Sequence, residues 1–237
     1  MIYPTVVLDN FFKNPDTIRD YALSLSYAPD EEGRWPGQRT PMLHTIDESL
    51  VYAFAKKILS VYYDTGSHVY WDGIQMAFHK IRPYSTDRNS LLNQGWIHTD
   101  GRRSFAGVVY LTPNAPLYTG TKIFMLKNGQ THTEGQQKYK ENLYKNQPIN
   151  EKEYNEEIKT LYDKFECVTE VKNVYNRCIQ YDAKQFHSGS NYHTEGEDRL
   201  SLIYFFTNVR TERTPYERMI FHDQEIMNKI NNIGEKQ

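Results

Sequence analysis

Six short segments rich in aromatic and β-branched residues constrain the fold of this chain more than any other feature. They lie at residues 68–71, 75–81, 105–111, 122–126, 174–182 and 199–207. Such segments, bounded by turn residues, predict β-strands, and most follow one another without an intervening helix. Several short strands in succession are typical of a sandwich or a barrel, so the sequence predicts a mainly β, α+β fold.

Helical patterns flank and interrupt these strands. The Asn-Pro-Asp run at 14–16 predicts the start of one N-terminal helix, and Thr45 with Glu48 predicts a capping box for a second. The polar stretch 135–166 predicts an amphipathic helix inserted between strands. Its apolar side chains recur at helical spacing, at Tyr154, Ile158, Leu161, Tyr162 and Phe165. A short final helix is expected around 226–233.

The length of 237 residues is consistent with a single domain. Residues 1–67 are expected to form an N-terminal helical support. Residues 68–207 are expected to form the strand core, with the helical insert at about 135–166. Residues 208–237 are expected to hold the C-terminal helix.

Charge and cysteine content exclude several classes of protein. The chain has 28 Lys and Arg against 30 Asp and Glu, so we expect no obligate nucleic-acid or membrane partner. Two cysteines, Cys167 and Cys178, favour a reducing compartment. No apolar run reaches the ~18 residues of a transmembrane helix, and the first residues lack the basic start of a signal peptide. We expect a soluble cytoplasmic protein, and the sequence does not indicate its oligomeric state.

Candidate metal ligands begin in the segment 96–100. His98 and Asp100 are two positions apart, so on an extended strand both side chains point to the same side and can reach one ion. A second histidine, His187, follows the predicted strand 174–182. Two histidines and one carboxylate on one face of an octahedral ion leave three positions open, as in non-haem Fe(II) oxygenases. A surface turn is the alternative for an isolated His-x-Asp.

Arg199 and Ser201 add a second candidate group, because they share one face of the predicted strand 199–207. A buried arginine needs an anion, and its planar fork matches a carboxylate, to which Ser201 would add a hydroxyl donor. The alternative is an ion pair between Arg199 and its neighbour Asp198. Neighbouring residues of a strand point to opposite faces, which argues against that pair.

Taken in order, His98-x-Asp100, His187 and Arg199-x-Ser201 resemble the 2-oxoglutarate- and Fe(II)-dependent dioxygenases, in particular the prolyl-4-hydroxylase-like branch. Residues 109–112, Val-Tyr-Leu-Thr, look like the Tyr-Leu-Asn segment of that branch, with Thr in place of Asn. Residues 119–124 are similar to its Gly-Gly-x-Thr-x-Phe strand, with Thr in place of the first Gly. The resemblance extends from about residue 8 to residue 207.

This resemblance implies a double-stranded β-helix, or jelly roll, with a metal at one open end. It implies that His98, Asp100 and His187 bind Fe(II). The C5 carboxylate of 2-oxoglutarate would meet Arg199, helped by Ser201 and Tyr110. The implied activity is that of a hydroxylase, which uses dioxygen and couples conversion of 2-oxoglutarate to succinate with oxidation of a second substrate. A halogenase would lack the carboxylate ligand, which is present here as Asp100.

Other polar residues near these motifs have two readings each. Arg102 and Arg103 follow the metal motif directly and are candidate substrate contacts, with solvated turn charges as the alternative. His193 lies in a polar loop between His187 and Arg199 and is a third candidate. The segment 35–39 either faces a substrate or serves as a packing turn.

Competing functions remain open on the sequence alone. A cupin-type metalloenzyme that does not use 2-oxoglutarate would need the three metal ligands but not Arg199. A zinc hydrolase would need a separate general base, for which there is no motif. A non-catalytic jelly-roll binding module would need no metal. The substrate, a small molecule or a protein or peptide, is not indicated.

Overall fold

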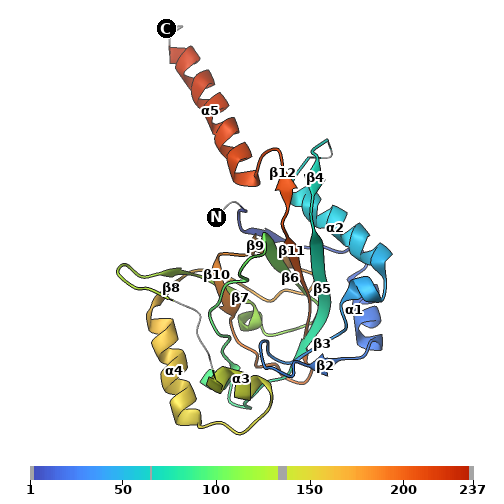
Figure 1. Cartoon of the computed structure of the whole chain (residues 1–237), viewed down its shortest axis with the longest axis vertical. Coiled ribbons are helices and arrows are strands. Elements are labelled where there is room, and N and C mark those ends of the chain that lie inside the picture. The colour runs from blue at the N-terminus through green and yellow to red at the C-terminus, as the bar shows by residue number, and fades with distance from the viewer. Residues whose placement is uncertain (1–2, 65, 133–137, 235–237) are drawn as a thin grey trace.

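A large antiparallel sheet runs through the centre of the computed structural model, which describes residues 3–64, 66–132 and 138–234 (Figure 1). Its strand order is β1-β9-β6-β11-β5-β3-β2. The strands are β1 (Val6–Leu8), β2 (Ala28–Pro29), β3 (Gln38–Arg39), β5 (Gly73–Ile81), β6 (Phe105–Tyr110), β9 (Cys178–Asp182) and β11 (Arg199–Thr207). Four of the six predicted strands lie in this sheet, and the N-terminal segment contributes three more strands in addition to its helices.

A second, smaller sheet joins β10 (Phe186–Gly189), β7 (Thr121–Leu126) and β8 (Phe165–Val171) in that order. A hydrogen bond of 2.7 Å between the hydroxyls of Tyr110 on β6 and Thr121 on β7 connects the two sheets. A short ribbon of β4 (Val69–Tyr70) and β12 (Arg210–Thr211) extends from one end of the large sheet. The prediction of a mixed fold of helices and antiparallel strands is therefore confirmed.

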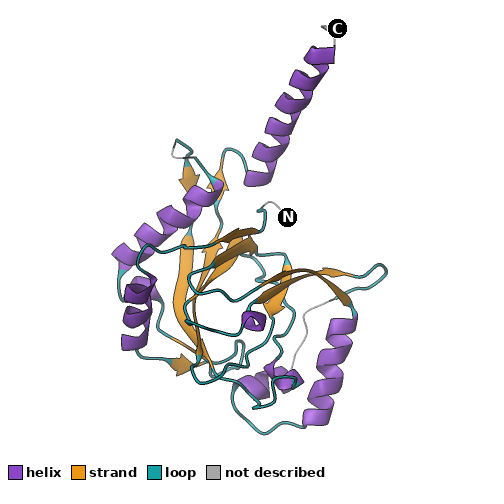
Figure 2. Cartoon of the chain, turned by 180° about the vertical axis from the view of Figure 1, so that it is seen from behind, coloured by secondary structure: helices purple, strands orange, loops and turns teal. Residues whose placement is uncertain are grey.

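Helices α1 (Pro15–Ser24) and α2 (Glu48–Tyr62) pack on one face of the large sheet, where the main hydrophobic core lies (Figure 2). In this core the ring of Phe54 on α2 contacts Tyr204 on β11, with centroids 5.0 Å apart. Because α1 and α2 cover one face of the sheet, the other face is the one left for a site. Within the described residues, none of the helices is long and apolar enough to cross a membrane.

The start of α2 differs from the predicted capping box. Asp47 is the N-cap, and its carboxylate accepts a hydrogen bond of 2.9 Å from the backbone N–H of Leu50. Thr45 lies instead in the short 3₁₀ helix η1 (Leu43–Thr45), where its hydroxyl donates to the carbonyl of Met42. Aspartate at this position caps the helix and also places a negative charge at its positive end.

The insert between β7 and β8 contains α3 (Lys138–Tyr144) and α4 (Glu151–Asp163). Much of the predicted apolar face of the longer helix is confirmed, because Tyr154, Ile158 and Leu161 are buried, but the helix ends at Asp163 and Phe165 is the first residue of β8. The Tyr154 hydroxyl accepts a hydrogen bond of 2.9 Å from Nε1 of Trp96, which connects the insert to the segment before the metal motif. Residues 135–137 of the predicted insert lie outside the described part of the chain.

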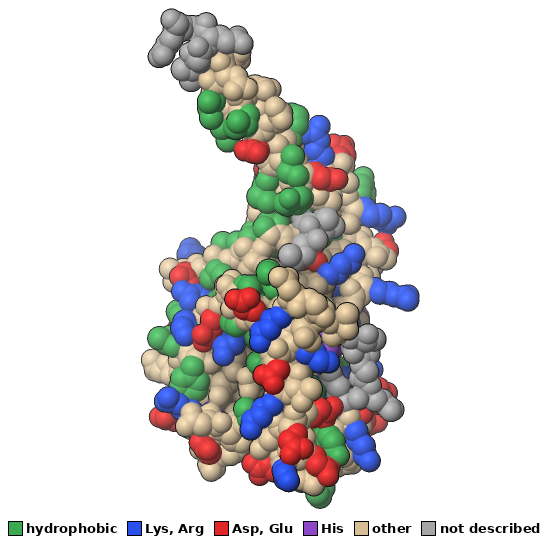
Figure 3. Space-filling model, turned by 90° about the vertical axis from the view of Figure 1, so that its left-hand side faces the viewer, with side chains coloured by type: hydrophobic (Ala, Val, Ile, Leu, Met, Phe, Trp, Pro, Cys, Tyr) green, Lys and Arg blue, Asp and Glu red, His purple; other side chains and the backbone are tan. Residues whose placement is uncertain are grey.

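Helix α5 (Pro215–Gly234) begins earlier than the predicted final helix and projects away from the two sheets (Figure 1). Apolar side chains gather along it (Figure 3). They include Met219, Ile220, Phe221, Ile226, Met227 and Ile230, each about half exposed.

Candidate metal centre and adjoining cavity

The three predicted metal ligands lie together at one end of the small sheet. His187 is on β10, and His98 is joined to it by an isolated β-bridge. Each histidine donates its backbone N–H to the carbonyl of the other, at 3.1 and 3.0 Å. The backbone N–H of Asp100 donates to the carbonyl of Ala183, just before β10. Backbone pairing between two segments far apart in sequence therefore fixes the positions of all three ligands.

Both imidazole rings are oriented by the same local contact. Nδ1 of His98 lies 2.8 Å from the carbonyl of Trp96, and Nδ1 of His187 lies 2.8 Å from the carbonyl of Gln185. A carbonyl can only accept, so Nδ1 carries the proton in each ring and the lone pair lies on Nε2. This arrangement is the usual way in which a metal-binding histidine is held in the correct tautomer.

The free ligand atoms converge on one point. Nε2 of His98 lies 3.9 Å from Oδ1 of Asp100, and Nε2 of His187 lies 3.4 Å from its Oδ2. One ligand atom from each of the three residues lies within 4.8 Å of the others, and no further cluster of this kind was found among the residues described. Ligand atoms ~2 Å from one ion and at right angles to each other would be about 3 Å apart. The three side chains therefore fit a single metal ion.

The electrostatic state of the site suits a metal as well. The pKa of His98 is lowered to about 4, first by partial burial of the side chain, 43% of which is exposed, and second because His187 is adjacent. The imidazole is therefore neutral at physiological pH, as a metal ligand must be. Oδ2 of Asp100 is buried and accepts no hydrogen bond from the described residues. An unpaired buried carboxylate oxygen is costly unless a cation is present to balance it.

Arg199 and Ser201 share one face of β11, as the strand pattern predicted, and of the two Arg199 is the one that lines the cavity described below. Its side chain is buried, with 4% of the residue exposed, and its Nε donates to the carbonyl of Thr119 at 2.8 Å. Asp198 points the other way and pairs with Arg82 at 3.1 Å. Arg199 makes no ion pair with any residue in the described ranges. Its guanidinium therefore has unused hydrogen-bond donors.

The predicted partners of Arg199 lie beside it. The hydroxyl of Ser201 is fully buried and has no hydrogen-bond partner in the described part of the chain. The ring of Tyr110 lies 5.5 Å from the Arg199 guanidinium, and its hydroxyl bonds to Thr121. Ser201 thus offers a free donor, whereas the Tyr110 hydroxyl is already engaged.

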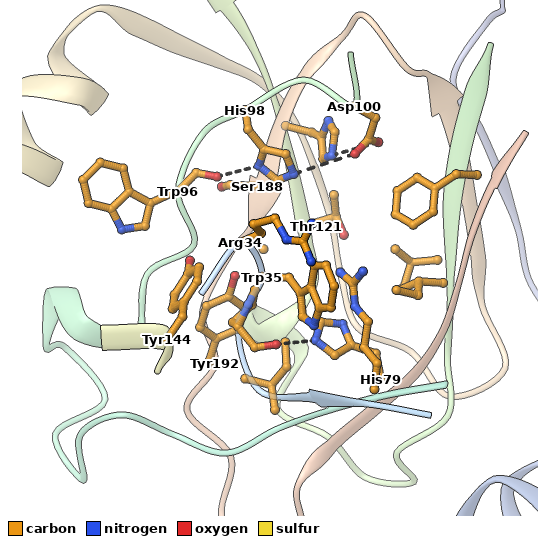
Figure 4. Close-up of a pocket in the computed structure, with 18 of the residues that line it drawn as sticks. Arg34, Trp35, His79, Trp96, His98, Asp100, Thr121, Tyr144, Ser188 and Tyr192 are labelled. Atoms are coloured by element: carbon orange, nitrogen blue, oxygen red, sulfur yellow. Dashed lines mark hydrogen bonds and ion pairs between the residues drawn. The ribbon is translucent and has the colours of Figure 1, made fainter. Parts of the chain in front are cut away.

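A cavity of about 290 Å³ connects the metal ligands with Arg199. In Figure 4, His98 and Asp100 lie together at one end of it, and His79 lies at the other. Val108 on β6 and Ile203 on β11 form part of its floor, and His187 faces them from the small sheet. The volume is near the lower end of the range for small-molecule sites, ~300–1,000 Å³.

Three predicted substrate contacts do not line this cavity. Arg102 is exposed. Arg103 donates to the carbonyl of Asp100 at 2.9 Å and to the side chain of Gln75 at 2.7 Å. The ring of His193 stacks on Tyr118, and its Nδ1 forms a hydrogen bond of 3.0 Å with the Tyr118 hydroxyl. Their role as substrate contacts stays a prediction.

Other cavity residues were not predicted to be part of the site. Trp35 and Arg39 line the cavity. Both belong to the segment 35–39, and this agrees with one of the two readings of that segment, in which it faces the site. His79 on β5 lies between strands that carry Arg39 and Ser201, and Nε2 of its ring bonds to the carbonyl of Pro36. Register across the sheet brings these residues together, and a single sequence does not reveal register.

The fold and the site together define a protein of helices and antiparallel sheets with a candidate site for one metal ion, formed by two histidines and one carboxylate. The chain belongs to a family described as "Family of unknown function (DUF6445)", which matches residues 2–197. A comparison with curated proteins gave no significant match.

Several solved structures are similar to the chain. A prolyl-4-hydroxylase from Pseudomonas putida is 14% identical, with a TM-score of 0.47, over 86% of this chain and 91% of that one. A 2OG-Fe(II) oxygenase family oxidoreductase from Burkholderia pseudomallei is 12% identical, with a TM-score of 0.43, over 90% and 87%. HygX from Streptomyces hygroscopicus, solved with nickel and 2-oxoglutarate, is 10% identical, with a TM-score of 0.49, over 87% and 84%.

These structures include members of the oxygenase group that the sequence motifs resemble. Their identities to this chain are at most 14% and their TM-scores are below 0.5. Arguments about chemistry therefore rest on the residues of this chain.

Proposed function

We propose that this chain is an Fe(II)- and 2-oxoglutarate-dependent dioxygenase, of the hydroxylase kind, built on a double-stranded β-helix. One observation carries the proposal. The free ligand atoms of His98, Asp100 and His187 face the same cavity as a buried arginine, Arg199, that has no anion. A metal site alone would not need that arginine, and a structural arginine would be paired.

In this proposal His98, Asp100 and His187 hold Fe(II) on one face and leave three positions free. Bound iron and 2-oxoglutarate supply the oxidising chemistry, in which dioxygen is consumed and succinate and carbon dioxide are formed. The residues contribute the geometry. The Trp96 and Gln185 carbonyls keep each Nε2 directed at the metal, and the buried walls exclude competing water.

Arg199 would bind the C5 carboxylate of 2-oxoglutarate. Its Nε is fixed by the Thr119 carbonyl, so the guanidinium is preorganised and its terminal nitrogens can take a carboxylate in a bidentate pair. The Ser201 hydroxyl, buried without a partner, would donate to the same carboxylate. Leaving such a hydroxyl unpaired costs about 1–3 kcal/mol, and the ligand removes that cost.

The proposal extends to the rest of the chain. The chain would be a single cytoplasmic oxygenase domain, with residues 1–67 as support, 68–207 as the jelly-roll core and 208–237 as the C-terminal helix. Retention of Asp100 favours a hydroxylase over a halogenase, which needs that position for its halide.

The test is an anaerobic titration of the metal-free protein with Fe(II) and then with 2-oxoglutarate. Chelation of Fe(II) by 2-oxoglutarate gives a weak visible charge-transfer band, which we expect from the wild type. His187→Ala should lose Fe(II) binding and the band. Arg199→Gln should keep Fe(II) binding but lower the affinity for 2-oxoglutarate by at least roughly 30-fold, because breaking a buried charge pair costs about 2–5 kcal/mol.

Two exposed residues supply matched controls. His44→Ala removes an exposed histidine, and Arg210→Gln removes an arginine that pairs with Asp72 on the surface. Both should behave as the wild type. Iron binding without a band would favour a cupin-type enzyme, and no metal binding would favour a binding module. Either result would overturn the proposal.

A further inference from the structure

A second arginine reaches the cavity from the edge of the large sheet. Arg39 on β3 lies opposite His79 on β5, and His79 lies opposite Ser201 on β11. Residues directly opposite each other on neighbouring strands point to the same face. Arg39 therefore faces the cavity on the same side of the sheet as Ser201 and Arg199, and it lines that cavity.

The hydrogen-bonding capacity of Arg39 and its neighbour Trp35 is not used. Nε of Arg39 and Nε1 of Trp35 are both buried, and neither has an acceptor in the ranges that the structure describes. The Arg39 guanidinium stacks on the Trp35 ring, 4.2 Å from its centroid. Asp30, a nearby acid, is already engaged by Arg34, which binds it at 2.9 Å. Two adjacent residues that line the cavity thus each carry a buried donor without an acceptor among the described residues.

Asp100 and Asp30 are the acids whose charges act on Arg39, and neither forms an ion pair with it among the residues that the structure describes. Burial lowers the pKa of Arg39 to about 9, yet the group stays protonated at neutral pH. The pKa of His79 is held well below its usual value, first by burial and then by Arg39 and Arg199, so this ring is neutral. Asp100 faces the cavity, but a metal ion would use its charge. Shielding a cation from water without an anion is unfavourable.

The cosubstrate does not resolve this imbalance. If the proposed function holds, one carboxylate of 2-oxoglutarate binds the metal and the other pairs with Arg199. Both of its charges are then used, and Arg39 still faces the cavity without an anion. The remaining molecule in the cavity is the substrate that is oxidised.

We propose that this substrate is a small carboxylic acid, whose carboxylate is bound by Arg39 and the indole N–H of Trp35. The inference rests on the proposed function and names its substrate class. Arginine presents a fork that matches the two oxygens of a carboxylate, and the indole adds one donor. The cavity of about 290 Å³ must also hold 2-oxoglutarate, so the substrate is compact.

The experiment uses the protein loaded anaerobically with Fe(II) and 2-oxoglutarate. Acetate, butyrate and benzoate are titrated into this complex, each beside its uncharged amide. The readouts are a shift of the charge-transfer band and the rise in Tm. At least one acid should shift the band and raise Tm, and its amide should do neither. Arg39→Gln should lower the affinity for that acid at least tenfold. Arg39→Lys, which keeps the charge, should retain part of it, and Arg210→Gln should match the wild type.

A direct titration with 2-oxoglutarate separates this inference from the proposed function. Arg39→Gln should bind 2-oxoglutarate within about threefold of the wild type, whereas Arg199→Gln should not. If Arg39→Gln lowers the affinity for 2-oxoglutarate as strongly as Arg199→Gln does, Arg39 belongs to the cosubstrate site and the inference is wrong. It is also wrong if no acid acts, if acids and amides act alike, or if the effect survives in Arg39→Gln. Absence of the band in the wild type would instead refute the proposed function.

Discussion

The hydroxyl of Tyr162 on the inserted helix α4 forms hydrogen bonds with the two segments that carry the candidate metal ligands. It donates to the carbonyl of Gly95 at 2.6 Å and lies 3.1 Å from the hydroxyl of Ser188, next to His187. Tyr162→Phe removes both contacts and keeps the ring. Each hydrogen bond contributes about 1 kcal/mol net, so we expect a loss of about 2 kcal/mol in the free energy of unfolding.

In a chain of this length, a loss of 1 kcal/mol lowers Tm by about 2–4 °C, so Tyr162→Phe should lower it by about 4–8 °C. Urea denaturation followed by circular dichroism would give the free energy directly, and the m-value should not change. Tyr139→Phe is the matched control, because its hydroxyl bonds to Glu153 on the exposed surface of the same insert. Its loss should stay below about 0.5 kcal/mol. Equal losses in the two variants would refute the idea that this buried hydroxyl holds the insert in place.

Further predictions concern packing, thiol reactivity and metal binding. Ile158→Ala on the buried face of α4 should cost about 2–5 kcal/mol, whereas Ile230→Ala on the projecting helix should change the free energy of unfolding by less than about 0.5 kcal/mol in urea denaturation. Cys167 is exposed and should react with a thiol reagent in the native protein. Cys178 is buried, with its pKa raised to about 12 by burial, and should react only after unfolding. Ni(II) at about 100 times its Kd should stabilise the metal-free protein by about 2.7 kcal/mol, measured as a rise in Tm that a chelator reverses.

Local sequence patterns predicted much of the fold. The strand expected at 199–207 is β11, and the one at 105–111 matches β6 within one residue. The strands that were not predicted include β8 and β10. The interior of β8 is exposed and polar, so it carries no apolar alternation, and β10 reads Phe-His-Ser-Gly, with too few β-formers to stand out.

The residues of the site likewise divide into those that local spacing in the sequence indicates and those that only long-range pairing brings together. His98 and Asp100 share a side because they are two positions apart, which a sequence shows directly. Arg39 was predicted to face the site only as one of two readings of the segment 35–39, because β3 is two residues long and has no period of its own. Its place beside His79 depends on register across three strands, and register is set by long-range packing.

The backbone bridge between His98 and His187 also sets an order of events during synthesis. One partner lies before the inserted helices and the other after them, so the bridge closes a long loop, and closing that loop costs conformational entropy. A nascent chain that ends before β10 holds two of the three ligands and lacks the strand that orients them. If the site binds a metal ion as proposed, all three ligands are in place only after the second sheet has closed, and the bound ion would then slow the reopening of that sheet.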